Sequence, residues 1–67
     1  MNYESWISNK VLNGEEATIR LCLLEREFGE TFTEKRISLW ADNLARKLGV
    51  KATIYIPSDV VTFYPKG

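Results

Sequence analysis

The chain has 67 residues, of which 45% are hydrophobic and 12% aromatic, and its nine basic residues balance nine acidic ones. This length predicts a single domain, 1–67, that buries only about 60% of its unfolded surface and has a radius of gyration of roughly 11 Å. The composition excludes an intrinsically disordered chain, because there is enough apolar material for a packed core.

Cysteine usage and hydropathy bear on location. Cys22 is the one cysteine, so no internal disulfide can form. Secreted domains of this size usually contain several cysteines, and we therefore expect an intracellular, cytoplasmic protein with Cys22 as a small buried residue. The start, MNYESWISNK, lacks the pattern of a signal peptide. No apolar stretch approaches the roughly 20 residues that cross a bilayer, and no membrane partner is expected.

Two segments in the first half favour helices. Residues 3–12, YESWISNKVL, place apolar side chains at three- and four-residue spacing, which predicts a short amphipathic helix. Residues 15–28, EEATIRLCLLEREF, are rich in leucine, glutamate and arginine, which favours a helix that ends at Gly29. The alternative for this segment is a strand, because apolar and polar residues alternate from Ile19 to Leu23.

Residues 34–48, EKRISLWADNLARKL, carry the clearest helix signal. Thr33 is a natural N-cap and Gly49 is the residue expected just past the helix end. Leu39 falls on the polar side of this helix. One face is apolar and is expected to enter the core, with Ile37, Trp40, Ala41, Leu44, Ala45 and Leu48.

The phrase LARKLGVKATIYIP, residues 44–57, allows two interpretations. It resembles a helix-turn-helix core, but the spacing LGV-K-A-T-I is one residue shorter than the usual LGV-S-x-x-T-I, and Pro57 would end the second helix early. It is also similar to a helix-to-strand unit of pyridoxal-phosphate enzymes of the threonine-dehydratase type, without their cofactor motifs. We favour strand 50–56, because β-branched and apolar residues alternate there with polar ones, followed by strand 60–64.

The predicted fold is therefore α+β, with three helices before a C-terminal β-hairpin, in an order like that of a winged helix (α-α-α-β-β). If residues 15–28 form a strand, the alternative is a small mixed sheet with one long helix packed across it. A likeness of element order concerns fold and does not by itself imply function.

Catalytic chemistry finds little support among the residues. The chain has no histidine, which excludes Ser-His-Asp and Cys-His catalysis and the usual zinc sites. Its four glycines are spread along the chain and form no phosphate-binding loop. We expect no enzyme activity, no cofactor and no metal.

The main candidate site is the outer face of helix 34–48. Leu39 forms an apolar centre with a polar rim, which is the usual anatomy of a protein contact. The leading hypothesis is a small adaptor or inhibitor, of the kind that phage and mobile-element genomes encode, whose partner is another protein. In the alternative, a winged-helix regulator binds nucleic acid through Arg36, Asn43, Arg46 and the hairpin. The full candidate set is Leu39, Arg36, Asn43, Arg46 and Lys35.

Two further hypotheses concern the hairpin and the distribution of charge. Tyr55 and Tyr64, with Lys51 and Lys66, form a secondary candidate: a stacking platform for nucleic-acid bases. Residues 1–34 contain three basic and seven acidic residues, whereas residues 35–67 contain six basic and two acidic ones. These opposite halves fit homo-oligomer formation by head-to-tail contact as well as a charged partner.

Overall fold

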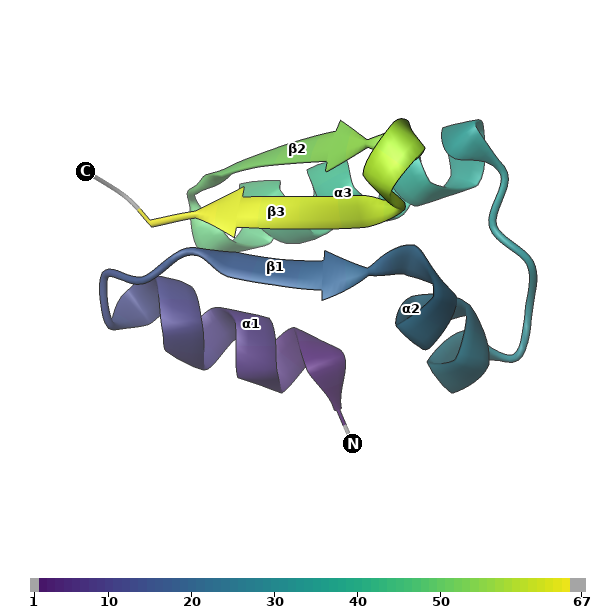
Figure 1. The fold of residues 1–67 in the computed structure, drawn as a ribbon. Coiled ribbons are helices and arrows are strands. Elements are labelled where there is room, and N and C mark those ends of the chain that lie inside the picture. Colours follow the sequence, from purple (N-terminus) through teal and green to yellow (C-terminus); the bar gives the residue numbers. More distant parts are fainter. Residues whose placement is uncertain (1, 66–67) are drawn as a thin grey trace.

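The computed structural model describes residues 2–65 and contains three α-helices, three strands and one short 3₁₀ turn (Figure 1). The Cα radius of gyration is 11.1 Å, which matches the value that the chain length predicts. The elements in chain order are α1 (Tyr3–Leu12), β1 (Ala17–Arg20), α2 (Leu21–Phe28), α3 (Glu34–Leu48), β2 (Lys51–Tyr55), η1 (Ile56–Ser58) and β3 (Val60–Tyr64).

The three strands form one antiparallel sheet in the order β1-β3-β2. β3 is the last strand in the chain and the central strand of the sheet, as Figure 1 shows. Its Phe63 is level with Ala17 of β1 on one side and with Ala52 of β2 on the other. β3 therefore joins the N-terminal part of the chain to the C-terminal hairpin.

One face of the sheet forms the core and the other faces solvent. Successive side chains of a strand point to opposite faces, and Val61 and Phe63 on β3 are fully buried whereas their neighbours on β3 are more exposed. The three helices pack on the buried face. The core consists of Ile7, Val11, Ala17, Ile19, Leu21, Leu24, Ile37, Trp40, Ala41, Leu44, Ala45, Val61 and Phe63.

Helix α3 has the predicted boundaries and the predicted caps. The Thr33 hydroxyl accepts a hydrogen bond from the backbone N–H of Arg36 at 3.1 Å, which satisfies a donor that the first turn leaves unpaired. At the other end Gly49 has φ 71°, and the N–H of Val50 donates to the carbonyl of Ala45 at 2.9 Å. The chain then continues as strand β2, so a second helix does not follow Val50.

The predicted single helix over 15–28 is wrong. Residues Ala17–Arg20 form strand β1, and the helix begins only at Leu21. A strand is more favourable than a helix here, because pairing with β3 buries Ala17 and Ile19 in the core and gives β3 a second hydrogen-bonded neighbour. The helix that the composition predicts is present from Leu21 onward: α2 ends at Gly29, which has the left-handed conformation of a C-terminal cap.

The hairpin differs from the prediction only at its ends. Strand β2 covers 51–55 instead of 50–56, because Ile56 and Pro57 enter the turn η1, while β3 has the predicted limits 60–64. The predicted α+β class is confirmed, and the three helices and the C-terminal hairpin follow one another as predicted, with β1 added between α1 and α2. A strand within residues 15–28 is part of the alternative prediction, a small mixed sheet with one long helix across it. The observed sheet is antiparallel throughout and therefore not mixed.

We predict that Phe63→Ala removes most of the stability of the domain. The ring is fully buried at the centre of the sheet and meets Trp40 edge to face, with centroids 5.7 Å apart. Truncating such a ring costs about 3–5 kcal/mol, whereas a chain this short has about 3–10 kcal/mol in total. Urea unfolding followed by circular dichroism measures the loss. Leu12→Ala, at an exposed position, is the control, and equal midpoints for the two variants would contradict the assignment of Phe63 to the core.

We predict that Gly49→Ala destabilises the domain by about 1–2 kcal/mol, because residues with a Cβ are disfavoured at positive φ. No atom lies within 4 Å of the position that a Cβ at Gly49 would occupy, so the cost comes from the backbone and not from a clash. Gly49→Asn should cost less, since asparagine adopts this conformation more readily. Thermal unfolding of both variants tests the order, and equal losses would contradict the backbone explanation.

Candidate functional site

The outer face of α3 is accessible as the sequence predicts. The side chain of Leu39 is 58% exposed, although it lies only one residue from Trp40, which is buried. Helical spacing places Lys35, Arg46 and Asp42 in a stripe with Leu39. All the predicted partner-binding residues are exposed: Leu39, Arg36, Asn43, Arg46 and Lys35.

Arg36 is held in place by the loop before α3. Its Nε donates to Oε1 of Glu30 at 3.0 Å, and its guanidinium lies 5.2 Å from the ring centroid of Phe32. Both charged side chains are nearly half exposed, so the pair contributes only about 0–1 kcal/mol to stability. Its main effect is to neutralise Arg36 at one end of the face. Within residues 2–65, neither Lys35 nor Arg46 forms an ion pair.

The secondary candidates lie on the solvent face of the sheet, far from the outer face of α3 in the two-layer arrangement. The strand register places Tyr55 level with Val60, and Lys51 level with Tyr64. Tyr55 is 59% exposed and Tyr64 is 36% exposed. The structure therefore brings Tyr55, Tyr64 and Lys51 together on one face. Lys66, the fourth predicted member, lies outside the described residues.

Sequence reasoning missed Arg20 and three threonines that share this face. Arg20 is level with Val60, and therefore with Tyr55 on the far strand. Thr18, Thr62 and Thr53 are level with one another across the three strands. The signal that could have revealed Arg20 is the two-residue alternation in ATIR, which the helix prediction for 15–28 overrode.

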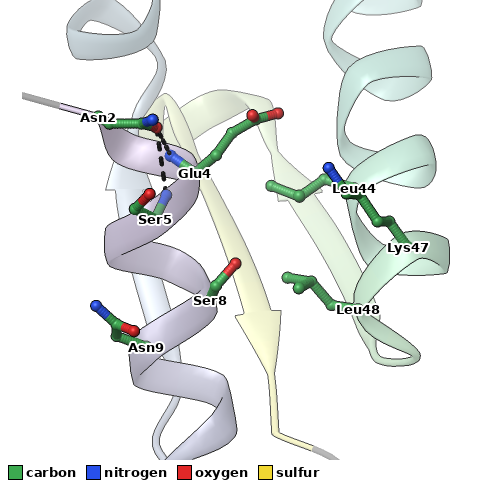
Figure 2. Close-up of a pocket in the computed structure, with 8 residues that line it drawn as sticks. All are labelled: Asn2, Glu4, Ser5, Ser8, Asn9, Leu44, Lys47 and Leu48. Atoms are coloured by element: carbon green, nitrogen blue, oxygen red, sulfur yellow. Dashed lines mark hydrogen bonds between the residues drawn. The ribbon is translucent and has the colours of Figure 1, made fainter.

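A groove of about 440 Å³ runs between α1 and the C-terminal half of α3 (Figure 2). In Figure 2 the side chains of Ser8 and Leu48 point toward each other across it. The Asn2 side chain at its end is already used, since its Oδ1 accepts from the N–H groups of Glu4 and Ser5. Leu44 is the only buried residue of the lining. The groove thus holds no buried polar group that could orient a ligand.

The structure also places Cys22 and the potential metal ligands. Cys22 is exposed, so the predicted buried position is wrong: the first turn of α2 directs Leu21 and Leu24 inward and leaves Cys22 outside. Among the described residues no group of three or more potential ligands is placed to hold a metal ion. In the same part of the chain no helix has the length and apolar content needed to span a membrane.

Comparisons with known proteins add no assignment. The sequence matches no protein-family model. Searches of curated proteins and of solved structures likewise give no match. The argument for function therefore rests on the two exposed surfaces, namely the outer face of α3 and the solvent face of the sheet.

We predict that Leu39→Asp leaves the free energy of unfolding within about 0.5 kcal/mol of wild type, as is usual for substitutions at exposed positions. Ile37→Asp, two residues earlier on the same helix, buries a carboxylate at a position that is 1% exposed and should cost more than about 3 kcal/mol. Urea titrations of the two variants test this contrast. A large loss for Leu39→Asp would show that Leu39 supports the fold instead of a surface.

Proposed function

We propose that the chain is a small intracellular, non-enzymatic protein-binding module, of adaptor or inhibitor type, that docks through the outer face of α3. The observation that carries the proposal is the exposure of Leu39 at the middle of a helix whose apolar residues Ile37, Trp40 and Leu44 are buried. An exposed apolar side chain surrounded by polar residues is the arrangement found at the centres of protein contacts.

The charges around Leu39 indicate the chemistry of the partner. On its stripe Leu39 lies between Lys35 and Asp42, and Arg46 follows one turn beyond Asp42. Arg36 is already paired with Glu30. The face is therefore weakly basic around an apolar centre. It fits a protein surface with an apolar pocket and a mainly acidic rim, because complementary charges guide association and exclude wrong partners.

The nucleic-acid alternative uses the same face less well. An exposed helix before a hairpin, with Arg46 and Asn43 on its outer side, supports a winged-helix mode of binding. Asp42 lies in the same stripe and would repel phosphate, and the turn of the hairpin carries Asp59 instead of a basic residue. Phosphate contacts supply most of the affinity of such proteins, so this face favours a protein partner.

We predict that Leu39→Asp abolishes retention of the partner in affinity capture from the native host, because a carboxylate cannot enter an apolar pocket without a large desolvation cost. Leu12→Asp is the matched control: Leu12 is 75% exposed on α1, so the same change of charge and hydrophobicity is made away from the proposed face. Quantitative mass spectrometry of the captured proteins measures the difference.

Purified partner then allows titration calorimetry. Arg46→Gln should weaken binding by a smaller factor than Leu39→Asp, and added salt should weaken wild-type binding. A captured protein that is retained equally by wild type, Leu39→Asp and Leu12→Asp would contradict docking through α3.

A further inference from the structure

The solvent face of the sheet has its own chemistry, distinct from that of α3. The strand register aligns three rows across it: Lys51 with Tyr64, a central row of threonines, and Tyr55 with Val60 and Arg20. Hydroxyl groups link the central strand to both neighbours, since Thr18 Oγ1 and Thr62 Oγ1 are 3.0 Å apart and Thr53 Oγ1 and Tyr64 Oη are 3.1 Å apart. The surface is thus ordered and rich in aromatic and hydroxyl groups.

The hydrogen bond of Tyr64 determines how its ring lies. Tyr64 belongs to β3 and is level with Lys51, but its hydroxyl reaches Thr53, two residues further along β2. The side chain therefore extends from β3 toward Thr53 on β2, and it is 36% exposed. Along β2, Tyr55 lies four residues from Lys51, the residue level with Tyr64. This separation is about 13 Å, so a few nucleotides of a single-stranded nucleic acid can reach both rings.

The charged groups of the paired rows on this face are both basic. Arg20 and Lys51 lie at opposite corners of the paired rows, and none of the paired residues on this face is acidic. Two exposed carboxylates border these rows: Glu16 directly precedes β1, and Asp59 directly precedes β3. The rows therefore combine two positive charges with two exposed aromatic rings.

At the edge strand β1 this surface opens into a cleft of about 450 Å³. Tyr3 and Trp6 of α1 line it beside Arg20 of β1. Lys10 adds a further positive charge, since its Nζ is 5.6 Å from the Trp6 ring centroid. Next to Arg20, α1 thus adds two aromatic side chains and a second cation.

We propose that the solvent face of the sheet, with the cleft at β1, binds single-stranded nucleic acid by stacking bases on Tyr64 and Tyr55 and by phosphate contacts from Arg20 and Lys51. Aromatic platforms with basic neighbours bind single strands in this way with little sequence preference, and sheets that present aromatic side chains stack unpaired bases of RNA. A duplex cannot use the platform, because its bases are already stacked on each other.

The test is fluorescence anisotropy with labelled single-stranded DNA and RNA of about ten nucleotides, at low salt, with a duplex of the same sequence as comparison. Wild type should bind the single strands in the micromolar range and the duplex at least about tenfold more weakly. Tyr55→Thr and Tyr64→Thr keep strand-forming residues and should each weaken binding about tenfold, whereas Tyr55→Phe keeps the ring and should bind like wild type.

Two further variants separate this surface from α3. Arg20→Gln with Lys51→Gln should weaken binding and reduce its salt dependence, while Arg36→Gln with Arg46→Gln on α3 should leave it unchanged. Absence of single-strand binding at about 100 µM protein, equal binding of duplex, or loss of binding only in the α3 variants would overturn the proposal. Circular dichroism of every variant shows whether a loss of binding reflects loss of fold.

Discussion

The structure depends on the insertion of β3 between β1 and β2. This strand is the last element of the chain, and it supplies hydrogen bonds to both neighbours and two fully buried side chains, Val61 and Phe63, to the core. Without it β1 and β2 would have no partner, since the two strands do not pair with each other. The β1–β3 pairs join residues 40 to 46 positions apart, so the sheet is complete only when β1 meets the C-terminal hairpin.

The two candidate surfaces follow from this two-layer architecture. A single layer of helices on one face of a sheet leaves the outer side of α3 and the far side of the sheet in solvent. The two surfaces differ in chemistry. On α3 the apolar side chain of Leu39 is surrounded by side chains of both charges, whereas on the sheet Tyr55 and Tyr64 lie among hydroxyl and basic groups. The two proposed binding faces therefore do not overlap.

Much of the α3 face could be predicted from sequence because its signals are local. A cap at Thr33, a stop at Gly49 and the spacing of apolar residues between them define which side of the helix turns outward. Leu39 could therefore be assigned to the surface without knowledge of the rest of the fold. The ion pair between Arg36 and Glu30 could not be predicted from sequence, because the loop that contains Glu30 has no periodic pattern that defines its path.

By itself the sequence determined the α+β class, the limits of α1 and α3, the hairpin and the exposure of Leu39, since all of these depend on residues close together in the chain. Only the tertiary structure decided that residues 15–28 divide into β1 and α2, that Cys22 faces solvent, and that Arg20 joins Tyr55 and Tyr64. The physical reason is that a four-residue strand has no stability of its own: it exists because β3, distant in sequence, offers it hydrogen bonds and a buried face.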